Sequence, residues 1–254
     1  MPTLARINVT PVKGTALQHV THADLTNVGI SGNRRFFLVD QRDRLSSGLA
    51  HGPLVQVVTV FDGTTLTCRF PDGLEISANS EDLGAPTVTD FYGRSVPGRV
   101  VEGPLADAFT AYVGEPVRLV RTDRDGDGPD ELPLTLVSLA SVEELGRRGG
   151  HPGLDPLRFR INLEIEGSEP FEEDTWDGGQ VRIGDAVLRI AGQIPRCAVT
   201  TQDPHTGLHD WNTLKQIARF RPLMATRDVP FGVYATVESP GRVTRGDAVS
   251  PLDR

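Results

Sequence analysis

Apolar residues in the first half of the chain fall in short runs separated by Gly, Asp, Asn or Pro, a pattern typical of β-strands joined by turns. The runs lie at Leu4–Val9, Arg35–Asp40, Leu54–Phe61 and Thr64–Phe70. One segment, Gly103–Gly114, spaces its apolar residues as a helix does. We therefore predict a β-rich N-terminal region with a single helix.

The order of elements changes in the second half. Leu134–Val137 is predicted to be a strand, and a helix opens at Ser141, which forms a capping box with Glu144. Asp210 is predicted to cap a later helix that carries Trp211. Further strands are predicted at Phe159–Ile165, Val181–Ile190, Ala198–Thr201 and Phe231–Val237. Strands dominate and helices are few, so the expected fold class is mainly β (α+β).

An acidic segment rich in Gly and Pro, RTDRDGDGPDELP, lies between the two halves at residues 121–133. Its Asp residues partly match a calcium-binding EF-hand loop, but Leu134 stands where the bidentate Glu is required. We therefore expect a solvated linker at 122–133 that separates a domain at 1–121 from a domain at 134–254.

Composition and charge narrow the classes of function. The chain has 254 residues, 38% apolar and 24% charged, as a soluble globular protein does. A net charge of −8 argues against nucleic acid or an anionic membrane as partner. No apolar run approaches the roughly 20 residues of a membrane helix, and the N-terminus has no signal core. We expect a cytoplasmic protein.

Two cysteines are too few for a disulfide framework, and the residues around them differ. Cys68 alternates with Leu66 and Phe70, which places it on the inward face of a strand. Cys197 follows Arg196, whose permanent positive charge favours the thiolate that metal ligation or nucleophilic attack requires.

Polar residues follow Cys197 along the chain. Thr200, Thr201 and Asp203 supply hydroxyls and a carboxylate for its surroundings, and we expect Thr200 and Thr201 to contact a cofactor bound there. Spacing alone supports a reactive thiol and an inert buried one equally.

Basic residues occur at the starts of predicted strands in this acidic chain. They are Lys13, Arg34, Arg35, Arg158 and Arg160. Such residues can gather around one small anion such as a phosphate. Considered without further information, scattered surface charge is the simpler interpretation.

A series of motifs in fixed order carries a family resemblance. After residue 130 they are RFRIN at 158–162, EPFEEDTW at 169–176, VRIGD at 181–185, PRC at 195–197, TTQDPHTG at 200–207, FGVY at 231–234 and VTRGDAV at 243–249. This set resembles the MOSC domain. The earlier pieces PVK at 11–13 and RFFLV at 35–39 resemble the β-barrel domain that precedes MOSC in many proteins. The whole is similar to the mitochondrial amidoxime reducing component and its bacterial relatives.

The resemblance implies an N-terminal β-barrel-like domain and a β-barrel MOSC domain with a few short helices. It also implies a molybdenum–molybdopterin cofactor. Cys197 matches the ligand to molybdenum, with Arg196 beside it. Arg160 and Asn162 match contacts to the pterin, and Lys13 and Arg35 match residues that reach the cofactor phosphate.

The implied activity is the reduction of N-hydroxylated compounds by oxygen-atom removal at molybdenum. Asp203 is then a candidate proton relay. No flavin, haem or iron–sulfur motif is visible, so we expect electrons from a separate protein. Two alternatives remain open: a sulfur carrier with a persulfide on Cys197, and a non-catalytic protein that binds or delivers the cofactor.

Overall fold

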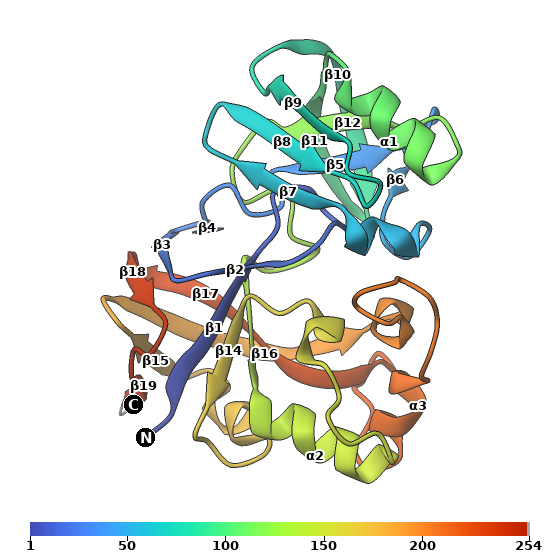
Figure 1. Ribbon diagram of the computed structural model, residues 1–254. Helices are drawn as coiled ribbons and strands as arrows, with labels where there is room; N and C mark the ends of the chain where they lie inside the picture. The colour runs from blue at the N-terminus through green and yellow to red at the C-terminus, as the bar shows by residue number, and fades with distance from the viewer. Residues whose placement is uncertain (253–254) are drawn as a thin grey trace.

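The computed structural model describes residues 1–252, in which strands far outnumber helices. The prediction of a mainly β fold is therefore confirmed. Within these residues the strands form four sheets. Figure 1 shows them in two groups, with β5–β12 and α1 in one and β1, β13–β19, α2 and α3 in the other.

The larger group is built on an eight-stranded sheet. Its spatial order is β19 (Val249–Leu252), β15 (Gln180–Ile183), β16 (Ala186–Arg196), β17 (Val229–Ser239), β13 (Leu134–Ser138), β14 (Leu163–Glu166), β1 (Thr3–Val9) and β2 (Gln18–Val20). A three-stranded sheet adds β18 (Gly241–Thr244), β3 (His22–Thr26) and β4 (Gly29–Ile30). The α-helices of this group are α2 (Leu139–Gly149) and α3 (Thr213–Ala218), and its 3₁₀ helices are η2 (Pro156–Phe159), η3 (Glu172–Trp176) and η4 (Ala198–Thr201).

The smaller group contains a five-stranded and a three-stranded sheet. The first has the order β10 (Leu83–Phe91), β11 (Arg94–Val101), β12 (Arg118–Thr122), β5 (Phe36–Val39) and β6 (Leu45–Ser46). The second has the order β7 (Val58–Phe61), β8 (Thr65–Arg69) and β9 (Glu75–Asn79). The 3₁₀ helix η1 (Gly52–Gln56) and the α-helix α1 (Leu105–Val113) complete it.

Strand β5 is buried on both faces, which explains its uninterrupted apolar sequence. Phe36 and Leu38 pack in one core cluster, whereas Phe37 and Val39 pack in another. The cluster around Phe36 also contains Cys68, as its predicted strand face requires. The strand thus joins two cores of the smaller group.

The first strands of the chain pair with strands from its C-terminal half, which differs from the expected split between 1–121 and 134–254. Ile7 in β1 pairs with Leu163 in β14, and Ala23 in β3 pairs with Val243 in β18. Leu4, Ile7 and Leu25 lie in one core cluster with the C-terminal strands. By strand pairing, residues 3–30 therefore join 134–252.

The acidic segment at 122–133 is packed against the protein, contrary to the solvated linker expected. Asp125 accepts hydrogen bonds from the hydroxyl of Ser31 and the backbone N–H of Gly32. Arg94 donates to the carbonyls of Asp127 and Pro129 at 2.8 and 2.5 Å. These partners are distant in sequence, so the local composition gave no sign of them.

Several local predictions were wrong because hydrogen bonds by side chains or a proline override strand propensity. Residues 54–56, expected at the start of a strand, belong instead to η1, which has Pro53 in its first turn. Residues 198–201 form η4, because the hydroxyls of Thr200 and Thr201 donate to the carbonyls three residues before them. Only the end of Phe159–Ile165 is a strand, and Val181–Ile190 is a hairpin of β15 and β16.

Both predicted helix caps were wrong, because a different residue caps each helix. Helix α2 begins at Leu139, capped by Ser138, and Glu144 instead pairs with two arginines on its own helix. Helix α3 is capped by Asn212, because the carboxylate of Asp210 binds Arg158. No helix within residues 1–252 combines the length and apolar character needed to cross a bilayer.

Candidate functional site

Cys197 lies at the end of β16, immediately before η4, and its side chain is exposed. Arg196 pairs with Val229, so β16 stays paired with β17 up to this point despite register shifts between Ile190 and Pro195. Cys68 is fully buried, and burial raises the pKa of its thiol to about 12. The two cysteines are therefore opposites in chemistry, since only Cys197 is accessible to a metal or an electrophile.

The side chain of Arg196 turns into the protein beside Cys197. Its Nε donates to the carbonyl of Phe231 at 2.7 Å, and its Nη1 donates to the carbonyl of Phe159 at 3.0 Å. Its Nη2 is buried without a hydrogen-bond partner. Burial lowers the pKa of Arg196 to about 10, so it stays charged at neutral pH. A buried cationic donor without a partner suits an anionic or polar ligand.

A cluster of cations surrounds one carboxylate. Lys13 Nζ lies 2.6 Å from Asp130, and Arg34 Nη1 lies 4.0 Å from the same side chain. Arg160 joins them electrostatically. Burial lowers the pKa of Lys13 to about 8 and that of Arg160 to about 9. Three cations against one carboxylate leave an excess of positive charge, which favours an anion.

Electrostatic contacts join this cluster to the cysteine. Cys197 and Arg34 both perturb the pKa of Arg196, although burial is the larger cause. Arg34 also donates to the carbonyl of Arg160 at 3.2 Å. The exposed thiol and the cations thus belong to one site, which we call the Cys197 site: Lys13, Arg34, Asp130, Arg160, Arg196 and Cys197.

A buried arginine, Arg158, holds the loop after Cys197 in place. Arg158 donates to the carbonyls of Thr200 and Gln202, each at 3.0 Å, and makes a two-pronged ion pair with Asp210. This pairing fixes both ends of the loop, and Arg158 is 3% exposed. The sequence showed Arg158 only as one of several basic residues, because its partners are backbone carbonyls distant in sequence.

The candidate proton relay, Asp203, is engaged in its own turn. Burial raises its pKa, but hydrogen bonds from the hydroxyl and N–H of Thr206 and from the N–H of His205 lower it overall. An ionised Asp203 therefore shapes the loop as an acceptor.

The turn between β10 and β11 also reaches the site, and the sequence did not predict this. The ring centroid of Phe91 lies 4.9 Å from Lys13 Nζ. Tyr92 follows at the turn and is 71% exposed. Burial of the phenol, then the charges of Asp130 and Cys197, raise the pKa of Tyr92. The only sequence signal was an aromatic residue before Gly93.

Four residues expected to bind the cofactor make other contacts. Arg35 Nη1 donates to Thr122 at 3.0 Å, whereas its neighbour Arg34 lies 4.0 Å from Asp130. The amide of Asn162 is buried and bonded to Thr135 and to the backbone of β1. The hydroxyls of Thr200 and Thr201 donate to backbone carbonyls within η4.

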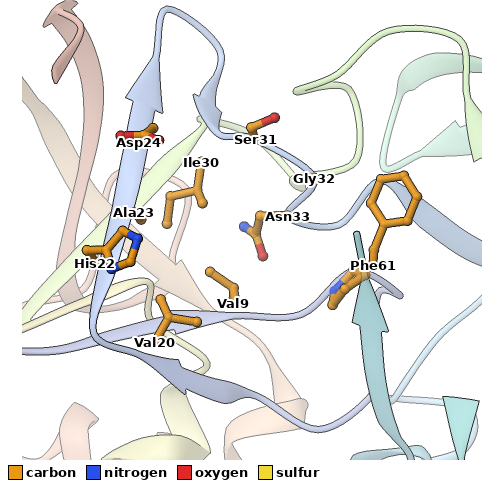
Figure 2. Close-up of a pocket in the computed structure, with 11 residues that line it drawn as sticks. Val9, Val20, His22, Ala23, Asp24, Ile30, Ser31, Gly32, Asn33 and Phe61 are labelled. Carbon is orange, nitrogen blue, oxygen red and sulfur yellow. The ribbon is translucent and has the colours of Figure 1, made fainter. Parts of the chain in front are cut away.

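Two cavities lie away from the Cys197 site. One of about 280 Å³ is bounded by β1, β2, β3 and β7, with Val9, Val20, His22 and Phe61 on its wall (Figure 2). The other, of about 460 Å³, is lined by Arg6, His19 and residues 153–157. None of the site residues lines either cavity.

Comparison with known proteins shows which family the chain belongs to. Residues 123–250 match the MOSC domain, and the chain belongs to this family. It is 28% identical to human mitochondrial amidoxime reducing component 2 over an alignment of 286 positions, which spans 97% of this chain and 82% of that protein. It is 34% identical to mouse mitochondrial amidoxime-reducing component 1, across 97% of this chain and 81% of that protein.

Among solved structures, the YuaD protein from Bacillus subtilis aligns with a TM-score of 0.45 and 14% identity, covering 98% of this chain and 94% of that one.

Proposed function

We propose that this protein is a molybdenum-cofactor-dependent reductase of N-hydroxylated compounds and that Cys197 is the protein ligand to the metal. The observation that carries the proposal is an exposed cysteine beside an excess of buried positive charge. Its similarity to amidoxime reducing components over nearly the whole chain supports the same reading.

The residues of the Cys197 site fit such a cofactor in two respects. The cofactor carries a phosphate, and Lys13, Arg34 and Arg160 offer a concentrated positive charge that can hold it by charge-assisted hydrogen bonds. Arg196 Nη2 is a buried donor that still lacks an acceptor. The Cys197 thiolate is a soft ligand suited to molybdenum.

The bound cofactor would supply two-electron oxygen-atom chemistry, and this chain's residues would provide the binding and orientation. Overall, an N–OH group, two electrons and two protons yield an N–H group and water. Arg158 keeps Cys197 in position by fixing the following loop. Asp203 shapes that loop, and we assign it a positioning role rather than proton transfer. The electrons would come from a separate donor protein.

Metal and pterin analysis tests the proposal directly. After expression with cofactor supply, the wild type is expected to hold about one molybdenum and one pterin per chain and to reduce benzamidoxime with an artificial donor. Cys197→Ala should lose reductase activity and most of its molybdenum, because the metal loses its protein ligand. Cys68→Ala is the matched control, since its thiol is buried in a core far from solvent.

Each alternative gives a different result in the same experiment. Metal-free wild type with a cyanolysable sulfur on Cys197 would identify a sulfur carrier and refute the reductase. Full cofactor content without benzamidoxime reduction would identify a binding or delivery protein. Unchanged molybdenum in Cys197→Ala would refute the ligand assignment.

A further inference from the structure

The turn between β10 and β11 carries a tyrosine, Tyr92, at a position where the backbone conformation favours asparagine or glycine. Phe91 pairs with Arg94, so Tyr92 and Gly93 form a two-residue turn. Their φ angles are both positive, 55° and 94°. Turns of this kind favour Asn-Gly, because a bulky residue in the left-handed region is strained. Tyrosine is therefore unfavourable for this backbone conformation, and its side chain is 71% exposed.

The two residues that flank the turn anchor it at the Cys197 site. The Phe91 ring contacts the ammonium of Lys13 at 4.9 Å. On the other side, Arg94 donates to the carbonyls of Asp127 and Pro129, next to Asp130. The turn therefore cannot move away from the cations without breaking contacts on both strands.

The phenol of Tyr92 lies within the electrostatic influence of the Cys197 site. The charges of Asp130 and Cys197 both act on it, after burial of the phenol itself. A side-chain hydrogen bond with Ser47 acts in the opposite direction and lowers the pKa of Tyr92. The ring of Tyr92 is largely open to solvent, and the thiol of Cys197 is exposed as well.

We propose that Tyr92 is a specificity residue that packs its ring against the aryl group of an aromatic N-hydroxylated substrate, with the N–OH group directed to the Cys197 site. This inference rests on the proposed function and names its preferred substrate class. Strained backbone at an exposed position is characteristic of functional residues. Aromatic rings also contribute attraction to another ring beyond the area they bury.

Tyr92→Asn separates this role from a structural one, because asparagine relieves the strained turn while removing the ring. The variant should reduce benzamidoxime with a kcat/KM lower by about tenfold, the size expected for a lost aromatic contact. Its kcat/KM for acetamidoxime, which has a methyl group in place of the ring, should stay within twofold. Its Tm should be unchanged or higher by about 2 °C.

Two further variants complete the design. Tyr92→Phe keeps the ring and should stay within twofold of wild type on both substrates. Val88→Ala removes a 60% exposed apolar side chain from the same strand and serves as the control for general surface effects. All variants should retain wild-type molybdenum content.

The outcomes distinguish this inference from the proposed function. Wild type with full cofactor that reduces neither amidoxime would refute the reductase and the Tyr92 role together. Active wild type with equal losses on both substrates in Tyr92→Asn, or with unchanged selectivity, would refute the Tyr92 role alone.

Discussion

At the scale of single residues, the site shows how adjacent side chains take separate roles. Arg34 and Arg35 are neighbours in sequence, and the family resemblance pointed to Arg35. In the structure Arg34 has a φ of 53° and reaches Asp130, whereas Arg35 bonds to Thr122. A positive φ in a bulky residue is rare, so the sequence did not predict the direction of the Arg34 side chain.

Replacing each arginine in turn tests this assignment. Arg34→Gln removes a cation from the proposed phosphate site and should weaken cofactor retention by about tenfold, as expected for a lost charge-assisted hydrogen bond. Arg35→Gln is the matched control and should retain the cofactor. The measurement is molybdenum per chain before and after extended dialysis. The reverse order of loss would restore the assignment made from the sequence.

The sequence did predict the contrast between the two cysteines, because both signals were local. The burial of Cys68 follows from strand alternation, and the distinct character of Cys197 follows from the adjacent arginine. The sequence could not predict the contact of Lys13 with Asp130, or the site of Tyr92. These contacts join segments far apart in the chain, and no local pattern encodes such a pairing.

At the scale of elements, the start of α2 contains a capping-box motif whose two residues do not cap the helix. Ser141 and Glu144 fit a capping box, but the helix begins earlier and Ser138 caps it. Ser141 instead donates its hydroxyl to Glu173 at 2.9 Å, and the N–H of Ser138 donates to the same carboxylate at 3.2 Å. A buried acceptor on η3 thus fixes the entry to the helix, which the helix sequence alone could not reveal.

Glu173 should make stability depend on pH. It is 1% exposed, and burial raises its pKa from 4.5 to about 7. The folded state therefore binds this proton more tightly than the unfolded state does. The resulting stabilisation is fully present below pH 4.5 and is lost as pH rises through about 7. The shift corresponds to roughly 3 kcal/mol.

Thermal unfolding of wild type and Glu173→Gln between pH 5 and pH 8 measures this effect. The glutamine cannot ionise, so the Tm of the variant relative to wild type should rise by several degrees across the range. Parallel pH profiles for the two proteins would show that Glu173 does not titrate there.

At the scale of the whole molecule, strands β1–β4 belong to the larger group, so the chain crosses between the two groups of sheets twice. The chain enters through β1 in the larger group, passes through the smaller group, and returns (Figure 1). Its ends meet, since the N–H of Val249 donates to the carbonyl of Pro2. The composition break at 121–133 was a real feature of the sequence, but it marked only the return crossing. The outward crossing after residue 30 has no such signal.

The two groups also touch beside the Cys197 site, where the loop after Cys197 meets the segment that leads into η1. Gln202 Nε2 donates to the carbonyl of Gly48 at 3.0 Å. The backbones of Gly52 and Gly207 are so close that a Cβ on Gly52 would lie 2.0 Å from the carbonyl oxygen of Gly207. This contact has no room for a side chain, so Gly52 is required there.

Gly52→Ala should therefore separate the loop from the smaller group. Backbone atoms cannot rotate away as a side chain can, so we expect a loss of about 2 kcal/mol and a Tm lower by roughly 5 °C. Gly48→Ala is the matched control in the same segment, because its Cβ would meet its nearest neighbour, in Gly14, at an ordinary 3.7 Å.

Activity should fall further in Gly52→Ala than lost folding explains, since the proposed cofactor site draws Arg34 from one side of this contact and Cys197 from the other. Measured on folded protein well below the Tm, benzamidoxime reduction per molybdenum should drop while Gly48→Ala stays at the wild-type level. If Gly52→Ala kept full activity per molybdenum despite a lower Tm, the contact would serve stability alone. The geometry of the Cys197 site would then be independent of how the two groups of sheets dock.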